Sequence, residues 1–565
     1  MTSIISLKKV RCKNCHKCIR SCPVNSIMYK DDQAQIMPEQ CILCGHCINT
    51  CPQNAKTVLS DIFKIRGYLK AHAVTVLSIA PSFSGLLRRP SLLPAILKKL
   101  GFSYVHETSE GAALVSLEYQ RLLELGTMDN IITTCCPTVN MLLEKYYPDL
   151  IPQMAPVVSP MVAHAKLLRE KYGPSAKIIF VGPCISKKEE ARDPRNAGLV
   201  DAVLTFEELI HWIKEEGLDQ DDLEEGSFDN DSPASARMYP ITSGIVTTII
   251  AQKGFYGYKT LCVDDIENCK ALFQDIRHGE VHGCFIEVNS CPGGCINGPV
   301  SGHEGSRFSA RLAVEAYTGP EQTTFPRIQR DSDLQAQFRD ASQKEDMPTE
   351  EELKQILHHI GKETREDELN CGACGYSTCR EKAISIFQGK SEPTMCLPYM
   401  KELAQSLSNS ILKVTPNVIF AVDEDLRIRE FNYQAERVFG LSRKEALDTY
   451  LYELIDTSDY EHIIKSRSAF LDRIVTYDNL GMTFSANILY MPEQRMVLGI
   501  LKDVTQEERA KANHHTLQMD TIAMAQKVID KQMTVAQEIA GLLGETTAET
   551  KVTLSRLKDM ISGEE

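Results

Sequence analysis

Three features that would place this chain in a common class are missing from its sequence. No apolar run approaches the roughly 18 to 20 residues that a membrane-spanning helix needs. Basic residues are outnumbered by acidic ones, 62 to 76, which argues against nucleic acid because basic clusters supply most of that affinity. A signal-peptide core is also missing, since MTSIISLKKVRCKNC reaches a cysteine motif first. We therefore expect no membrane span, no nucleic-acid partner and a cytoplasmic location.

Cysteine, in contrast, is abundant, with twenty residues in a chain of 565. A cytoplasmic compartment keeps thiols reduced, so these cysteines cannot mainly form disulfides. Metal ligation is their expected use. The length allows three or four domains.

Residues 1–60 contain two runs of four cysteines with the same spacing, each followed by proline. The runs are Cys12, Cys15, Cys18, Cys22 and Cys41, Cys44, Cys47, Cys51. This pattern predicts a two-cluster 4Fe-4S ferredoxin domain, in which the fourth cysteine of each run binds the other cluster. One cubane is therefore assigned to Cys12, Cys15, Cys18 and Cys51, and the other to Cys41, Cys44, Cys47 and Cys22. Zinc fits poorly, because zinc sites take four ligands in two pairs.

Residues 66–345 alternate strand-like apolar runs, such as 74–80, 130–135 and 177–182, with helical stretches, which predicts an α/β domain. Its cysteines follow the predicted strand ends, in loops where functional groups of α/β folds gather. The loops are TTCCPTVN with Cys135 and Cys136, VGPCISKKEEA with Cys184, and EVNSCPGGCINGP with Cys291 and Cys295. Four separated thiolates and one extra thiol can hold a cubane.

These loops, in this order, resemble the three signature loops of the FeFe hydrogenase catalytic domain. The resemblance implies an H-cluster, a 4Fe-4S cubane joined to a di-iron subsite that carries CO, cyanide and a bridging dithiolate amine. It implies that the cubane is bound by Cys136, Cys184, Cys291 and Cys295. Cys295 would also bridge to the di-iron subsite.

The same resemblance suggests roles for the neighbouring residues. Pro81 and Ser82 match a cyanide-side loop, and Lys187 can donate a charge-assisted hydrogen bond to a cyanide. Cys135 matches the thiol that relays protons beside the bridging amine, although a small buried hydrophobe is an alternative role for it. We also predict catalytic roles for Lys187, Glu118 and Glu190.

Several residues around this core differ from those of the family's fast members. Gly182 and Asn289 replace methionines, and Met161 replaces a glutamine. The series of carboxylates that carries protons in the family is also incomplete here. Glu118 lies near one of the family's carboxylate positions, but Leu122 occupies another. These changes leave cluster ligation untouched and predict low turnover.

Residues 346–405 predict a small domain with a third cubane. Thr349 and Glu352 form a capping box that begins a helix, and Gly361 ends it. The following cysteines have the spacing of the single 4Fe-4S domain of electron-transport and corrinoid proteins, although a structural zinc is an alternative. They are Cys371, Cys374, Cys379 and Cys396.

Residues 409–505 resemble a PAS domain, because Val418, Phe420 and Val422 alternate on one face and a turn follows at 423–425. Residues 506–565 are helix-type sequence with an apolar stripe that suits a coiled coil, a docking helix or a helix packed on its own chain. The predicted fold class is thus multidomain α/β and α+β.

The leading hypothesis is an FeFe hydrogenase that senses hydrogen or redox state and signals through the PAS domain and the terminal helix. Its expected partners are H2 and protons, a redox partner such as ferredoxin, a signalling kinase or phosphatase, and a second copy of the chain. One alternative is a metabolic hydrogenase coupled to ferredoxin. Another is a non-catalytic, hydrogenase-like iron-sulphur assembly factor.

Overall fold

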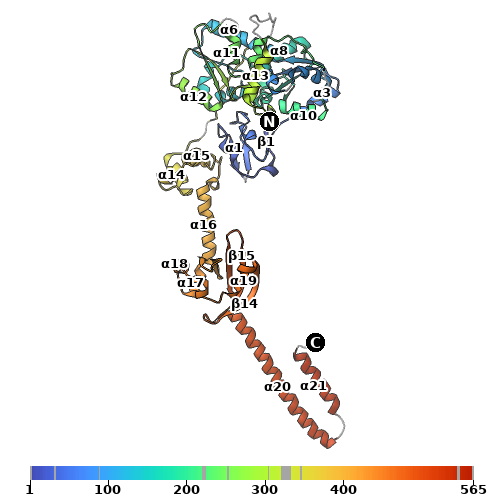
Figure 1. Ribbon diagram of the computed structural model, residues 1–565, viewed down its shortest axis with the longest axis vertical. Helices are drawn as coiled ribbons and strands as arrows, with labels where there is room; N and C mark the ends of the chain where they lie inside the picture. The colour runs from blue at the N-terminus through green and yellow to red at the C-terminus, as the bar shows by residue number, and fades with distance from the viewer. Residues whose placement is uncertain are drawn as a thin grey trace. The chain divides into compact units, whose positions relative to one another are not determined.

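The computed structural model describes residues 3–30, 33–87, 89–218, 224–250, 254–302, 305–319, 333–343, 346–543 and 547–562. The chain forms two compact units, residues 1–399 and 400–565 (Figure 1). In the part of the chain that is described, no helix combines the length and the apolar character needed to cross a membrane.

The ferredoxin-like part of the first unit is built from two similar halves. Strands β1 and β4 pair antiparallel, as do β2 and β3. Each half places a residue with positive φ just before its short helix, His16 in one and Gly45 in the other, so the two cysteine loops share a backbone turn. The elements are β1 (Ile5–Leu7), η1 (Lys9–Arg11), α1 (Lys17–Arg20), β2 (Ile27–Lys30), β3 (Gln33–Ile36), α2 (His46–Asn49) and β4 (Lys56–Val58).

Two parallel sheets form the centre of the first unit, one in the order β6-β5-β8-β9 and one in the order β10-β11-β7. Strands β5, β9 and β11 are buried along their whole length, as expected where helices cover both faces of a parallel sheet. The strands are β5 (Thr75–Ile79), β6 (Tyr104–Glu107), β7 (Ile131–Ile132), β8 (Lys177–Gly182), β9 (Ala202–Thr205), β10 (Lys259–Asp264) and β11 (Cys284–Asn289).

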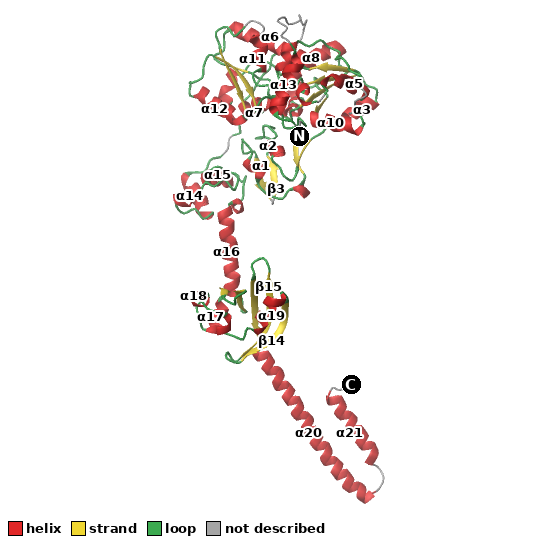
Figure 2. Cartoon of the chain, in the orientation of Figure 1, coloured by secondary structure: helices red, strands yellow, loops and turns green. Residues whose placement is uncertain are grey.

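Helices surround these sheets (Figure 2). The α-helices are α3 (Ile62–Lys70), α4 (Phe83–Leu86), α5 (Leu93–Lys99), α6 (Ser109–Leu125), α7 (Pro137–Tyr146), α8 (Pro160–Tyr172), α9 (Ser186–Glu190), α10 (Phe206–Glu215), α11 (Gly244–Ile250), α12 (Ile266–Arg277) and α13 (Arg307–Thr318). The short 3-10 turns are η2 (Pro90–Leu92), η3 (Pro148–Gln153), η4 (Pro194–Asn196), η5 (Ala234–Met238) and η6 (Cys295–Asn297).

A small helical module completes the first unit. The capping box of Thr349 and Glu352 forms as the sequence predicts, and α14 begins directly after Thr349. The elements that follow the sheets are α14 (Glu350–His359), η7 (Arg365–Asp367), α15 (Cys379–Phe387), η8 (Pro393–Met395) and α16 (Leu397–Val414).

The second unit contains an antiparallel sheet of five strands in the order β13-β12-β16-β15-β14. The predicted inward face is confirmed, because Val418, Phe420 and Val422 are all buried in its core. Its elements are β12 (Val418–Asp423), β13 (Ile428–Phe431), α17 (Tyr433–Phe439), α18 (Arg443–Ala446), η9 (Leu451–Glu453), α19 (Ser458–Ser466), β14 (Ala469–Tyr477), β15 (Met482–Met491) and β16 (Met496–Asp503).

The C-terminal region forms two helices, α20 (Thr505–Leu543) and α21 (Thr547–Ser562), where the sequence predicts one uninterrupted helix. Residues 544–546, between them, lie outside the described residues. The apolar stripe of α20 is exposed, with Leu517 at 66% and Val528 at 59%.

Candidate functional site

The cysteine loops of the central domain meet because they follow the carboxyl ends of parallel strands. Cys135 and Cys136 follow β7, Cys184 follows β8, and Cys291 follows β11. Strands β7 and β11 are neighbours in one sheet and β8 belongs to the other, so the site lies where the carboxyl ends of strands from both sheets meet, the end at which α/β folds bind their ligands. The structure thereby brings together segments that are far apart in the sequence.

These loops enclose a cavity of about 90 Å³. Burial raises the pKa of the Cys184 thiol and holds that of Cys291 well above its ordinary value, so these thiols need a cationic partner to ionise. An iron-sulphur cluster is such a partner, and its binding would release their protons. The cavity is lined by all four predicted cubane ligands, Cys136, Cys184, Cys291 and Cys295.

Lys187, on α9, also lines this cavity. Its ammonium donates to the carboxylate of Glu190 at 2.7 Å and to the backbone oxygen of Cys135 at 3.3 Å. Burial alone would lower the pKa of Lys187, but the negative groups around it, Glu190 first, raise the pKa above its ordinary value. The site therefore presents a fixed positive charge.

Pro81 and Ser82 enter the cavity from the loop after β5, as predicted from the sequence. The Ser82 hydroxyl is buried and makes no hydrogen bond to any described residue. A buried hydroxyl without a partner is costly, so a ligand that accepts a hydrogen bond from it would fit here. The donor set of thiols, ammonium and hydroxyl thus suits the predicted H-cluster.

The thiol of Cys135 contacts Tyr119, a residue that was not predicted from the sequence to belong to the site. Its Sγ atom lies 3.2 Å from the hydroxyl of Tyr119, on α6. Burial raises the pKa of Cys135 to about 12 and holds that of Tyr119 well above its ordinary value, so both groups keep their protons at neutral pH. The predicted acid Glu118 is buried and accepts a hydrogen bond from Arg121 at 2.9 Å.

The residues that depart from the fast members of the resembled family also border the cavity. Met161 and Asn289 line it, together with Phe180, which the sequence gave no reason to single out. A Cβ atom on Gly182 would lie 2.7 Å from the ring of Phe180. A methionine at position 182 would therefore require this ring to move.

Glu287 supports the third cysteine loop from β11. Its carboxylate accepts hydrogen bonds from the backbone N–H groups of Ser243, Ile245 and Val246, at 2.8 to 3.1 Å. Burial nevertheless raises the pKa of Glu287 to about 7. The carboxylate ties β11 to the start of α11.

The structure also gathers the other predicted cluster ligands. One cavity is lined by Cys12, Cys15, Cys18 and Cys51, so the fourth cysteine does cross from the second run. Burial raises the pKa values of Cys41, Cys44 and Cys47, and the charge of Cys22 raises them further, so Cys22 lies near these three thiols. A third cavity is lined by Cys371, Cys374, Cys379 and Cys396.

The ferredoxin-like part packs directly against the cysteine loops of the central domain. A Cβ atom on Gly45 would lie 2.4 Å from Pro299 and 3.0 Å from Ile185. The small module packs against the ferredoxin-like part in turn, since Arg20 donates to the backbone oxygen of Ala373 at 3.2 Å. The cluster sites therefore lie in contiguous packed segments.

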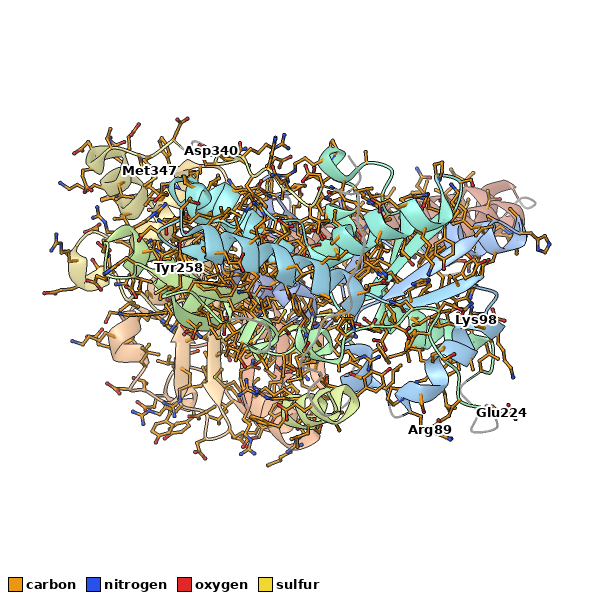
Figure 3. All side chains as sticks on the ribbon, turned by 90° about the horizontal axis from the view of Figure 1, so that it is seen from above. Arg89, Lys98, Glu224, Tyr258, Asp340 and Met347 are labelled. Atoms are coloured by element: carbon orange, nitrogen blue, oxygen red, sulfur yellow. The ribbon has the colours of Figure 1, made fainter. Side chains whose placement is uncertain are left out.

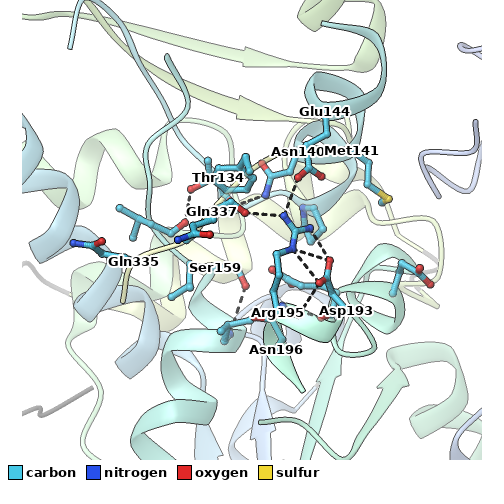
Figure 4. Close-up of a pocket in the computed structure, with 18 of the residues that line it drawn as sticks. Thr134, Asn140, Met141, Glu144, Ser159, Asp193, Arg195, Asn196, Gln335 and Gln337 are labelled. Carbon is cyan, nitrogen blue, oxygen red and sulfur yellow. Dashed lines mark hydrogen bonds and ion pairs between the residues drawn. The ribbon is translucent and has the colours of Figure 1, made fainter. Parts of the chain in front are cut away.

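A larger polar cavity of about 380 Å³ is lined in part by Ser186, Glu189 and Glu190 of α9 (Figure 4). Arg195 donates to Glu144 at 2.8 Å and forms an ion pair with Asp193 at 2.6 Å. Glu190 lines this cavity while it binds Lys187 of the cluster cavity. The Lys187–Glu190 pair thus stands between the two spaces.

Family models match four parts of the chain. Residues 4–52 match a 4Fe-4S dicluster domain, 73–299 the iron-only hydrogenase large subunit, C-terminal domain, 367–398 an Fe-S cluster domain, and 406–478 the PAS fold. The chain therefore contains hydrogenase, ferredoxin and PAS domains, as its motifs indicate. The predicted fold class is confirmed.

The chain is similar to curated hydrogenases over part of its length. It is 28% identical over 254 residues to the periplasmic Fe hydrogenase large subunit of Nitratidesulfovibrio vulgaris, covering 36% of this chain and 60% of that protein. It is 27% identical to iron hydrogenase 1 of Clostridium pasteurianum, covering 36% of this chain and 44% of that protein. The chain thus spans less than two thirds of either relative.

The chain is also similar to proteins of another class. The chain is 36% identical over 89 residues to the cytosolic Fe-S cluster assembly factor NAR1 of Vanderwaltozyma polyspora, covering 16% of this chain and 17% of that protein. Among solved structures, an FeFe-hydrogenase of Chlamydomonas reinhardtii matches with 21% identity and a TM-score of 0.38, over 48% of this chain and 91% of that one.

Proposed function

We propose that the chain is an FeFe hydrogenase that interconverts H2 with two protons and two electrons, and that it serves as a hydrogen or redox sensor. The observation that carries this proposal is the cavity in which four cysteine thiols, Lys187 and the unpartnered Ser82 hydroxyl converge. It lies within the segment that matches the hydrogenase family model.

The residues of the cavity have distinct tasks in this proposal. Cys136, Cys184, Cys291 and Cys295 would hold the cubane of the H-cluster. When bound, the H-cluster supplies the redox-active irons at which hydrogen is split or formed. Lys187 and Ser82 offer hydrogen-bond donors to anionic ligands, and Glu190 keeps the Lys187 ammonium charged and oriented.

Protons reach the cavity through the thiol of Cys135 in this proposal. The neighbour of this thiol, Tyr119, carries a phenol and not a carboxylate. A phenol with a raised pKa gives up its proton reluctantly, so transfer through Tyr119 is slow. This supports a catalyst of low turnover, which suffices when only the redox state of a cluster is read.

Electrons leave through the ferredoxin-like part. The contact of Gly45 with Pro299 and Ile185 supports this route, because Gly45 lies between Cys44 and Cys47 of the cluster proposed for Cys22, Cys41, Cys44 and Cys47. The second ferredoxin cluster and the cluster of the small module then extend the route. The PAS domain and α20 would report the redox state to a signalling partner, such as a kinase or phosphatase.

The main competing function is a non-catalytic assembly factor, because relatives of that class match parts of the chain. A metabolic hydrogenase coupled to ferredoxin is the other alternative. The presence of Cys135 and Lys187 in the cavity supports a hydrogenase, since a protein without a di-iron subsite has no use for a proton relay or a cyanide donor.

Infrared spectroscopy of the matured protein tests the choice. We expect bands of metal-bound CO and cyanide in the native protein and their loss in Cys295→Ser. Cys262→Ala is a matched control, because Cys262 is exposed and belongs to none of the predicted ligand sets. Absence of the bands in native protein whose cubanes are loaded would favour the assembly factor.

A further inference from the structure

A second group of potential metal ligands lies outside the cysteine loops. His106 is at the end of β6, Glu110 is in the first turn of α6, and His164 is on α8. Each residue offers one ligand atom, and the three atoms lie within 4.8 Å of one another. The Nε2 atom of His164 and the Oε2 atom of Glu110 are 3.4 Å apart.

Both imidazole rings are buried, each 0% exposed. Among the described residues, no hydrogen-bond partner is found for Nδ1 of His106, and Nε2 of His164 faces Oε2 of Glu110 only at the long distance of 3.4 Å. Buried polar atoms are nearly always paired, so an unpaired nitrogen beside a long imidazole–carboxylate contact points to a bound group.

The other nitrogen of each ring is fixed by a hydroxyl. His106 Nε2 lies 2.8 Å from the Tyr172 hydroxyl, and His164 Nδ1 lies 2.8 Å from the Ser78 hydroxyl. If each of these nitrogens carries the proton, Nδ1 of His106 and Nε2 of His164 have lone pairs available to an ion. Metal-binding histidines are held in the required tautomer by such outer hydrogen bonds.

The carboxylate is fixed in the same way. Asn230 donates to Glu110 Oε2 at 2.9 Å and also accepts from the backbone N–H of Glu107, so it positions Glu110 relative to β6. The neighbouring Asp229 is held by Lys98, labelled in Figure 3, at 2.5 Å. Asp229 and Asn230 are therefore anchored beside the three ligands.

Close packing of α6 and α8 brings the ligands together. A Cβ atom on Gly111 would lie 2.4 Å from the backbone oxygen of Pro160, so only glycine allows this approach next to Glu110. The Glu110 side chain is 19% exposed, which leaves a route for an ion from solvent.

We propose that His106, Glu110 and His164 form a mononuclear site for a divalent transition-metal ion of the zinc class, separate from the iron-sulphur clusters. Two imidazoles and one carboxylate are a ligand set that zinc accepts, with a fourth position for water. Tetrahedral ligands at about 2.1 Å from zinc are about 3.4 Å apart, which is the His164–Glu110 separation. The ion would tie the β6–α6 junction to α8.

Zinc is the suitable probe, because the clusters dominate any iron analysis. Full-length protein with reconstituted clusters is dialysed against Zn²⁺ under argon, and bound zinc is counted by mass spectrometry. We expect one zinc per chain, retained in His211→Gln, a matched control whose exposed imidazole pairs with Glu215 on α10. Glu110→Gln keeps the shape of the side chain and should weaken binding more than about 100-fold, because even loss of an outer-shell partner costs 10- to 100-fold.

Zinc bound to cysteine would mimic this result, so X-ray absorption at the zinc edge is measured on the native protein. It needs no variant, and it therefore stays informative even if a substitution impairs folding. We expect only nitrogen and oxygen neighbours at about 2.0 to 2.2 Å, and no sulphur at about 2.3 Å. Sulphur neighbours, equal zinc in native protein and Glu110→Gln, or no retained zinc would each overturn the proposal.

Discussion

The Cys135 thiol and the Tyr119 phenol, 16 residues apart in the sequence, lie 3.2 Å apart at the wall of the cluster cavity. Tyr119 is fully buried, and its hydroxyl also accepts from the backbone N–H of Thr134 at 2.9 Å. The pair places a proton donor and acceptor next to the proposed reaction site. In the proposed function, the first group beyond the thiol on the proton route would therefore be a phenol.

Tyr119→Phe tests this step. Removal of the hydroxyl should lower the rate of hydrogen turnover about tenfold or more, because the thiol loses its hydrogen-bond partner for proton exchange. The infrared spectrum of the cofactor should not change. Tyr258→Phe is the control, since that tyrosine, labelled in Figure 3, packs on the same core and donates to Met128. Equal rates in Tyr119→Phe and native protein would show that protons take another route.

Cys135→Ala should have a larger effect. A general acid or base in reach of the reacting group contributes between about 100- and 10,000-fold, and we expect a loss of hydrogen turnover in that range. Cys135 is not assigned to any cubane, so iron content and cluster spectra should stay those of the native protein. A variant with undiminished turnover would return Cys135 to the role of a small buried hydrophobe.

The stability of the first unit should depend on pH through Glu287. Its pKa rises from an unfolded value near 4.5 to about 7, so the folded state binds more protons between these values. Stability should therefore fall as the pH rises through this window, by up to about 3 kcal/mol. Melting temperatures between pH 5 and 8 provide the measurement.

Glu287→Gln isolates the contribution of this carboxyl to the pH dependence of stability. The amide cannot titrate, so the pH dependence should be shallower in the variant. Its NH2 group would face backbone N–H donors, because both carboxylate oxygens accept from them, and the variant should be less stable overall. Identical slopes in the two proteins would mean that Glu287 does not titrate in this range.

The cluster sites of the ferredoxin-like part were accessible from the sequence because most of their ligand spacing is local. Runs such as Cys12 to Cys22 must fold into one loop, and the crossing of Cys51 follows from the known pattern of such runs. Tyr119 was not accessible, since its contact with Cys135 depends on how α6 packs on β7. The same holds for His164, which approaches His106 and Glu110 only because Gly111 lets α8 come close. The unpaired Ser82 hydroxyl is likewise visible only once its surroundings are folded.

Iron content tests the cluster assignments as a set. Three cubanes and a six-iron H-cluster would give about eighteen irons per fully matured chain. Cys379→Ala should remove the four irons of the small module and leave the infrared bands of the hydrogenase site intact. A native protein that carries zinc in this module, with correspondingly less iron, would contradict the third cubane.

Truncation of the chain tests whether hydrogen chemistry and signalling belong to different units. If the second unit reports the redox state, a chain that ends near residue 409 should still activate hydrogen in a dye-reduction assay but should no longer bind a signalling partner. The first unit is compact by itself, so its chemistry should survive the truncation. A difference of about 1.4 kcal/mol between oxidised and reduced states would already change partner binding tenfold.

The exposed stripe of α20 is the proposed contact for a second copy or for that partner. Leu517, Val528 and Val535 are 46 to 66% exposed, which is unusual for aliphatic side chains spaced along one helix. Val528→Glu should weaken self-association at least tenfold in sedimentation experiments and leave dye reduction unchanged. Asp530→Lys, a charge change at an exposed position on the opposite face of the same helix, is the control. If both variants associate like native protein, and the truncated chain captures the same proteins under hydrogen and argon as the full chain does, the metabolic alternative gains the stronger support.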